Sequence, residues 1–146
     1  MVEFNGIQIR RVQGRHGTGI WADHMGCVSG FILISEDEPL VYWTGDTVLY
    51  DEVKYVVSRS SPEVIITHSG GASIGNSGPI IMDAKQTIEL CKFATGSKIV
   101  AVHLESLDHL KVTRNDLRKE ALKNGISEDN LLIPEDGDVL KFNKIF

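Results

Sequence analysis

The chain has 146 residues, of which 42% are hydrophobic and 24% are charged, and its formal net charge is −5. This length fits a single domain over residues 1–146 with a buried core, and the composition excludes a disordered or fibrous protein. The negative charge argues against nucleic acid as a partner, and the apolar runs are far too short to span a membrane.

The first residues show neither the charged nor the apolar region of a secretory signal, and the two cysteines lack the spacing of a disulfide framework. We therefore expect reduced thiols in a cytoplasmic protein. His24 and Cys27 are spaced as in some zinc sites, but no fourth ligand is in view. We expect Cys27 to be a small buried residue.

The first strand is expected over residues 7–12, where Ile7, Ile9 and Val12 alternate imperfectly with polar residues. It ends in a glycine-rich loop, residues 14–19, that contains His16. Residues 21–27 have no clear period, which indicates an ordered loop.

Residues 31–34 and 40–43 are predicted to form an antiparallel pair of strands, because turn-forming residues of hairpin length separate them. The second strand runs into Gly45, which allows a sharp turn, and then into Asp46. A carboxylate in this position lies where open α/β sheets place ligands, although Asp46 could equally cap the next helix.

Helices and strands alternate in the rest of the chain. We expect helices over residues 49–57, 84–94 and 113–125, and strands over residues 64–67, 99–102, 131–133 and 139–142. The last helix opens with a capping box at Thr113 and is expected to bury Leu117, Ala121 and Leu122. This order predicts an α/β fold with a mixed sheet and helices on one face.

His16, Asp46 and His103 each follow the end of a predicted strand, so the fold could bring them together. Imidazole nitrogens and a carboxylate are ligands that Zn²⁺ and related divalent ions accept. Each histidine alone could also be a surface residue or a hydrogen-bonded core residue. The shared placement at strand ends therefore favours a metal site.

Several segments resemble the later motifs of the metallo-β-lactamase superfamily, and their order and spacing carry the likeness. They are residues 16–19, 29–31, 42–47 and 102–104, with further similarity at residues 81–84, 107–109 and 113–114. The resemblance covers nearly all of the chain. It implies an αβ/βα sandwich with one or two metal ions at the sheet edge.

The resemblance also implies roles for individual residues. His16 and His103 would be histidine ligands, Asp46 would bridge the ions, and Asp46 and His103 would act in catalysis. The implied reaction is hydrolysis of a small-molecule ester, lactone, amide or phosphoester by metal-activated water. Zinc is the expected ion, with manganese, iron or nickel as alternatives.

The chain contains no His-x-His motif, which supplies most of the metal ligands in the resembling proteins. It therefore resembles the carboxyl-terminal half of the fold, and a bound metal and hydrolytic activity could both be absent. Half of a sandwich would leave an apolar sheet face uncovered. We expect a homodimer that covers it, and the alternative function is a non-catalytic remnant or oligomeric binding module.

A second alternative is a serine hydrolase, because residues 71–75 match Gly-x-Ser-x-Gly with Ser73 as the nucleophile. Asp83 and then His103 or His109 follow in the order of α/β-hydrolases. Ser73, however, is expected several residues from both the preceding strand and the next helix, whereas a nucleophile elbow joins the two directly.

Two further histidines follow or flank predicted strand ends. His68 could support the ligands from outside the metal's own coordination shell. Asp108 and His109 could orient His103, since a ligating imidazole usually donates its other N–H to a neighbouring group. The alternative for Asp108 and His109 is a surface loop that caps the next helix.

Overall fold

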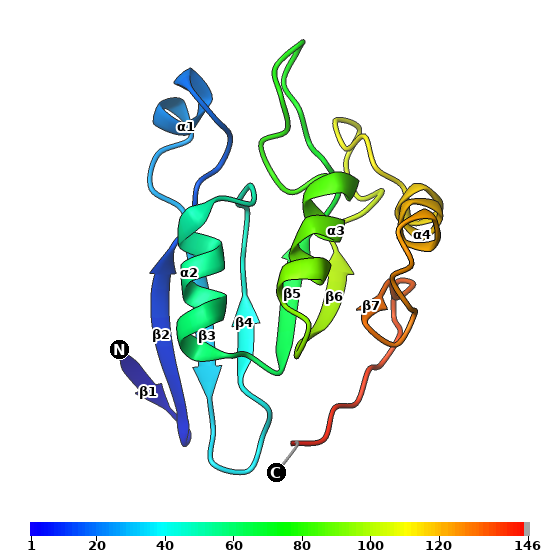
Figure 1. The fold of residues 1–146 in the computed structure, drawn as a ribbon. Helices are drawn as coiled ribbons and strands as arrows, with labels where there is room; N and C mark the ends of the chain where they lie inside the picture. Colours follow the sequence, from blue (N-terminus) through cyan, green and yellow to red (C-terminus); the bar gives the residue numbers. More distant parts are fainter. Residues whose placement is uncertain (145–146) are drawn as a thin grey trace.

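The computed structural model describes residues 1–144, which form one seven-stranded mixed sheet with helices (Figure 1). The strands are β1 (Val2–Phe4), β2 (Ile7–Gln13), β3 (Ser29–Ile34), β4 (Val41–Trp43), β5 (Val64–His68), β6 (Lys98–Val102) and β7 (Leu131–Leu132). The helices are α1 (Ile20–His24), α2 (Asp51–Ser60), α3 (Ala84–Phe93) and α4 (Arg114–Lys123). The strand order in the sheet is the order along the chain.

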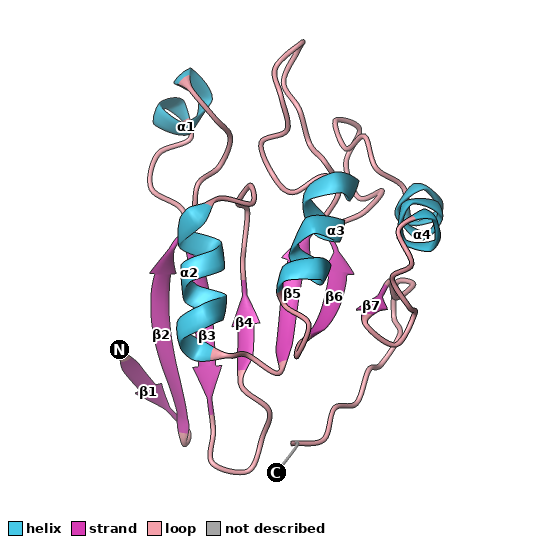
Figure 2. Cartoon of the chain, viewed as in Figure 1, coloured by secondary structure: helices cyan, strands magenta, loops and turns pink. Residues whose placement is uncertain are grey.

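The sheet is antiparallel from β1 to β4 and parallel from β4 to β7. Each parallel connection contains one helix, and α2, α3 and α4 lie on one face of the sheet (Figure 2). Crossover connections between parallel strands are almost always right-handed. Because β4 to β7 follow one another in the same direction across the sheet, their three connecting helices lie on the same face. The predicted α/β class, with a mixed sheet and helices on one face, is confirmed.

The main core lies between this face and the helices. Ile32, Tyr42, Ile65 and Ile99 are register partners on four adjacent strands, and all four are buried. Aliphatic side chains of the three helices, among them Val53, pack against this row. Because alternate residues of a strand point to opposite faces, their neighbours in sequence lie on the other face.

The other face of the sheet carries a second row of register partners, which consists of Arg11, Phe31, Trp43, Ile66 and Val100. No helix of the described residues covers this face. Phe31 and Trp43 remain 37% and 44% exposed, although both are large apolar residues. We refer to this row and its neighbours below as the open sheet face.

The helix boundaries follow local signals in the sequence. The side chain of Asp83 accepts a hydrogen bond from Gln86 N and caps α3. The predicted capping box of α4 is confirmed, because Thr113 and Asp116 bond each other's backbone N–H groups. After α2, Ser61 adopts a left-handed conformation, and the chain turns into β5.

Three local predictions were wrong, and one strand was missed. Residues 20–24 form a short helix rather than a loop, and strand β1 was not expected, because all of its residues are exposed and show no alternation. Residues 139–142 form no strand. Leu122 is 82% exposed, since it lies on the side of α4 that faces away from the sheet.

Within the described residues, none of the helices is both long enough and apolar enough to cross a membrane.

Candidate functional site

The carboxyl ends of β2, β4, β5 and β6 lie at one edge of the sheet, the upper edge in Figure 1. His16, Asp46 and His103 follow three of these ends, and His68 is the last residue of β5. His16, Asp46 and His103 line one cavity of about 300 Å³. The three residues thus reach one cavity, whereas their roles as metal ligands stay predictions. The group of donor atoms compact enough for one ion contains Asp46, His68 and His103 but not His16.

Asp46 is presented by a sharp turn at the end of β4. Thr44 N donates a hydrogen bond of 2.9 Å to Ile66 O, which holds the start of the turn against β5. Gly45 follows with a φ of 65°, a conformation that residues with a side chain rarely adopt. The turn thereby directs the Asp46 carboxylate into the cavity.

The loop that carries His16 is bound to the loop that carries Asp46. Arg15 N donates to Thr47 Oγ1 at 2.9 Å, and Val48 N donates to Arg15 O at 2.8 Å. Thr47 and Val48 are buried, whereas Arg15 is exposed, so these bonds attach a surface loop to a buried turn. His16 and Asp46 are therefore held in a fixed relation although they are distant in sequence.

His103 directly follows β6 and has a φ of 57°. Its Nδ1 lies 3.2 Å from Ser106 Oγ, so the loop after the strand engages this ring nitrogen. The backbone of Gly70 packs against the carbonyl oxygen of His103, where a Cβ would overlap. Positive φ values of residues with a side chain are strained and are found frequently at functional sites.

His68 is more closely integrated into the site than its sequence position indicated. Its Nδ1 lies 2.6 Å from Asp46 Oδ1, and its Nε2 accepts a 3.0 Å hydrogen bond from Trp43 Nε1. Its ring centroid is 5.0 Å from that of His103. One donor atom each from Asp46, His68 and His103 lies within 4.8 Å of the other two, which is compact enough to surround one ion.

The electrostatics of the site favour an ionised carboxylate beside neutral imidazoles. The hydrogen bond from His68 lowers the pKa of Asp46, burial opposes this effect, and the nearby imidazoles lower the pKa further when they are protonated. Burial lowers the pKa values of His16 and His103, against the opposing effect of Asp46. Neutral imidazole and ionised carboxylate are the protonation states that bind metal ions.

The rest of the cavity wall is mainly apolar. Its other lining residues are Met25, Ala72, Ile74, Ile80, Ile81, Leu107 and His109. Ile80, Ile81 and Ala72 form a small buried cluster of their own, so this wall is packed from behind. A few polar groups in an apolar wall are typical of small-molecule sites.

The serine-hydrolase alternative lacks its expected geometry. Ser73 pairs with Pro79 in an isolated bridge within the long loop between β5 and α3, so it does not lie on a strand-to-helix turn. Among residues 1–144, no imidazole forms a hydrogen bond with the Ser73 hydroxyl.

The remaining expectations had mixed outcomes. Cys27 and Cys91 are both free thiols, but Cys27 is exposed rather than buried, because it lies in the loop after α1. His109 lines the cavity, yet among the described residues Ser106, rather than Asp108 or His109, forms the side-chain hydrogen bond with His103. Ser106 and Trp43 are two site residues that the sequence analysis did not identify.

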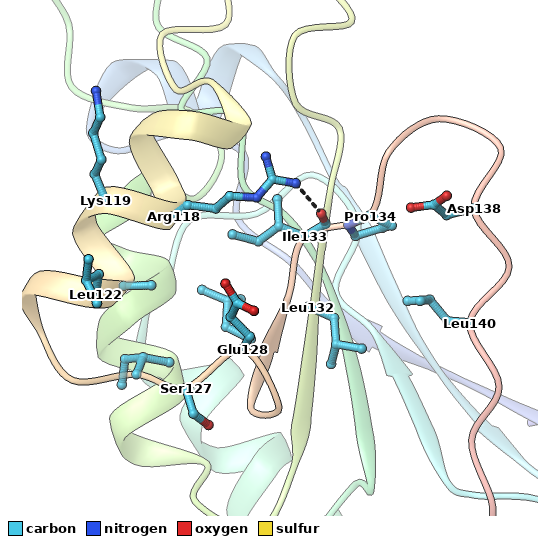
Figure 3. A pocket seen from close by; sticks show the side chains of 13 residues that line it. Arg118, Lys119, Leu122, Ser127, Glu128, Leu132, Ile133, Pro134, Asp138 and Leu140 are labelled. Atoms are coloured by element: carbon cyan, nitrogen blue, oxygen red, sulfur yellow. Dashed lines mark hydrogen bonds between the residues drawn. The ribbon is translucent and has the colours of Figure 1, made fainter.

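A larger groove of about 500 Å³ lies elsewhere, between α4 and the segments around β7 and Leu140 (Figure 3). Arg118 crosses its wall and donates a hydrogen bond to Ile133 O. Apolar side chains, including Leu132, form much of its surface. It shares no lining residue with the cavity at the strand ends.

No family model matches the chain. Among curated proteins, the UPF0173 protein YddR of Bacillus subtilis is 34% identical over 140 residues, which are 95% of this chain and 55% of YddR. A UPF0173 metal-dependent hydrolase of Ignicoccus hospitalis is 22% identical over 117 residues, which are 80% of this chain and 46% of that protein. The chain thus spans about half the length of these curated relatives.

Solved structures give the same picture. An isothiocyanate hydrolase from Delia radicum gut bacteria superposes with a TM-score of 0.89 and 34% identity, covering 97% of this chain and 57% of that protein. The metallo-beta-lactamase fold protein YhfI from Bacillus subtilis superposes with a TM-score of 0.65 over 94% of this chain and 49% of YhfI. YhfI is only 14% identical, so this second match bears on the fold alone.

Proposed function

Because this chain belongs to the metallo-β-lactamase superfamily, we propose that it contributes His16, Asp46 and His103 to the divalent-metal site of a hydrolase. The superfamily and the fold inferred from the sequence motifs are confirmed. The observation that carries the proposal is that two imidazoles and a carboxylate from three separate loops line one cavity.

The donor chemistry of the cavity fits such an ion. Neutral imidazole nitrogens and one carboxylate form the mixed nitrogen and oxygen set that zinc accepts, and manganese, iron and nickel can use similar donors. A bound divalent ion would supply Lewis-acid chemistry, polarising a substrate and activating water. Asp46 would hold the ion through its carboxylate, and His16 and His103 would hold it through ring nitrogens.

The substrate is proposed to be a small molecule with an electrophilic carbon or phosphorus, such as an ester, lactone, amide or phosphoester. The cavity of about 300 Å³ with an apolar wall suits a compact ligand. The similarity to an isothiocyanate hydrolase adds an isothiocyanate to this set, since its central carbon is also attacked by water. The apolar residues would exclude bulk water while the polar groups orient the substrate.

Metal content is the direct test. The purified protein is incubated with Zn²⁺, Mn²⁺, Fe²⁺ or Ni²⁺, freed of unbound ion and analysed for metal, alongside Asp46→Ala and the exposed control Asp37→Ala. We expect stoichiometric metal in the wild type and in Asp37→Ala, and its loss in Asp46→Ala. If none of the ions binds, or if Asp46→Ala retains the ion, the metal site is wrong and the non-enzymatic alternative gains support.

We also propose that a second copy of this chain covers the open sheet face in a homodimer. Exposed Phe31 and Trp43 lie in one row on that face, and large contiguous apolar patches favour association. The curated relatives are nearly twice as long as this chain, so a second layer of comparable size would have to come from outside these residues. A second copy would supply that layer by using the same face.

Light scattering on the isolated chain tests this association. We expect a dimer for the wild type and a monomer for Phe31→Lys, with Tyr55→Lys on the helical side as the exposed control. A compact wild-type monomer at high protein concentration would refute the homodimer and leave a longer polypeptide as the source of the covering layer.

A further inference from the structure

Both ring nitrogens of His68 have a hydrogen-bond partner. Nδ1 lies 2.6 Å from Asp46 Oδ1, and Nε2 lies 3.0 Å from Trp43 Nε1. The His68 side chain is 17% exposed, whereas that of Asp46 is 41% exposed. His68, which is less exposed than Asp46, therefore lies between the indole of Trp43 and the carboxylate of the candidate site.

The chemistry of the indole fixes the tautomer of His68. The Nε1–H group of Trp43 can only donate a hydrogen bond, so Nε2 of His68 has to accept it. A neutral imidazole that accepts at Nε2 carries its hydrogen on Nδ1. His68 therefore donates Nδ1–H to Asp46, and the direction of both hydrogen bonds follows from the single donor of Trp43.

We propose that His68 is a positioning residue of the metal site, held by Trp43, and that it is not itself a metal ligand. The inference rests on the proposed function, in which Asp46 binds the ion. The hydrogen bond from His68 occupies Oδ1 of Asp46, while Oδ2 of Asp46 has no hydrogen bond within residues 1–144. His68 thus orients the carboxylate so that Oδ2 remains available to an ion.

Distance alone would favour a different assignment, because donor atoms of Asp46, His68 and His103 lie within 4.8 Å of one another. A metal ligand, however, must offer a lone pair. Nδ1 of His68 carries a proton, and the lone pair of Nε2 is directed to the indole. Ligation by His68 would therefore break one of its two hydrogen bonds, whereas ligation by Asp46 and His103 would break neither.

The strand register holds Trp43 in place. Trp43 pairs with Phe31 on one side and Ile66 on the other, so its backbone is fixed within the sheet. Its indole ring and the His68 imidazole have centroids 6.1 Å apart and are tilted by 56°. Trp43→Phe is therefore a suitable variant, because it keeps an aromatic ring and removes only the N–H donor.

The first experiment determines the tautomer directly. Long-range ¹H–¹⁵N NMR spectra of the whole 146-residue chain are recorded without metal and with added Zn²⁺. We expect His68 to carry its proton on Nδ1 in both states, while a nitrogen of His103 shifts on zinc addition. Loss of the proton from Nδ1 of His68 on zinc addition, or a proton on Nε2 in either state, would overturn the proposal.

The second experiment measures zinc affinity in variants of the same chain. His68→Gln keeps an N–H group that can donate to Asp46, whereas His68→Phe removes it. Loss of an outer hydrogen-bonding partner typically weakens metal affinity by about 10- to 100-fold. We expect His68→Phe and Trp43→Phe to lose affinity at unchanged stoichiometry, and His68→Gln to recover most of it.

The two experiments distinguish failure of this inference from failure of the proposed function. If the wild type binds no zinc, the metal site is wrong, and the tautomer of the metal-free protein alone decides whether His68 holds Asp46. If the wild type binds zinc but His68→Gln is as weak as His68→Phe, an N–H donor at position 68 does not account for the affinity and the positioning role is refuted.

Discussion

A Cβ atom placed on Gly45 would stand 2.5 Å from the carbonyl oxygen of Ser29. The turn that presents Asp46 is therefore pressed against β3, and only a residue without a side chain fits there. The φ of 65° at Gly45 adds a second requirement for glycine at the same position.

Gly45→Ala is expected to lower the free energy of unfolding by about 2 kcal/mol or more, because it adds a clash with the backbone to an unfavourable conformation. Gly26→Ala is the matched control, since Gly26 has a φ of 69° but open space around its Cβ position. Urea denaturation of both variants measures the difference. Equal losses would show that the contact with Ser29 is unimportant.

Tyr42→Phe is expected to stabilise the protein by about 1 kcal/mol, because the buried Tyr42 hydroxyl has no partner among the described residues. Burial also raises the pKa of this hydroxyl well above its ordinary value. Tyr50→Phe is the control, since the Tyr50 hydroxyl donates to Gln13 O at 3.1 Å. Thermal unfolding should give a higher Tm for Tyr42→Phe and a lower Tm for Tyr50→Phe. A lower Tm in both variants would contradict the prediction.

Arg114→Lys is expected to destabilise the segment after β7 by about 1–2 kcal/mol, since lysine cannot replace a guanidinium that contacts several groups at once. Arg114 donates to Glu105, Pro134 O and Asp136, and it thereby ties α4 to two loops. Hydrogen exchange should become faster around residues 134–138.

Arg118→Lys is the control for this change, because the Arg118 side chain is more exposed than that of Arg114. Arg118→Lys should accelerate hydrogen exchange around residues 134–138 less than Arg114→Lys does. A larger effect at Arg118 would show that Arg114 is not the main connection.

The two thiols should differ in reactivity. Cys27 is exposed, whereas burial raises the pKa of Cys91 to about 12 and blocks access of reagents. A thiol reagent at pH 8 should modify one cysteine in the folded protein and both in urea, and Cys27→Ser should abolish the reaction of the folded protein. Reaction of Cys91 at the rate of Cys27 would contradict its burial.

The sequence was sufficient to predict the strands whose ends carry the candidate site. Buried strands ending at residues 43, 68 and 102 produce clear apolar runs, and an α/β sheet brings such ends to one edge. The placement of Asp46 and His103 could therefore be predicted from one sequence. The resemblance to the superfamily then supplied the proposed chemistry, which spacing alone left open.

The sequence was insufficient where a contact depends on side chains from different strands. The bonds of His68 to Trp43 and Asp46 join residues 25 and 22 positions apart, and no local pattern encodes them. Strand β1 and helix α1 were missed for another reason. Their side chains are mostly exposed, so neither carries the apolar period by which such elements are identified.

The match between strand order and chain order has a consequence for synthesis. Each strand pairs with the one made just before it, and no later strand has to be inserted between two earlier ones. A nascent polypeptide leaving the ribosome could thus add strands one at a time to a growing edge, with each new helix closing over the last addition.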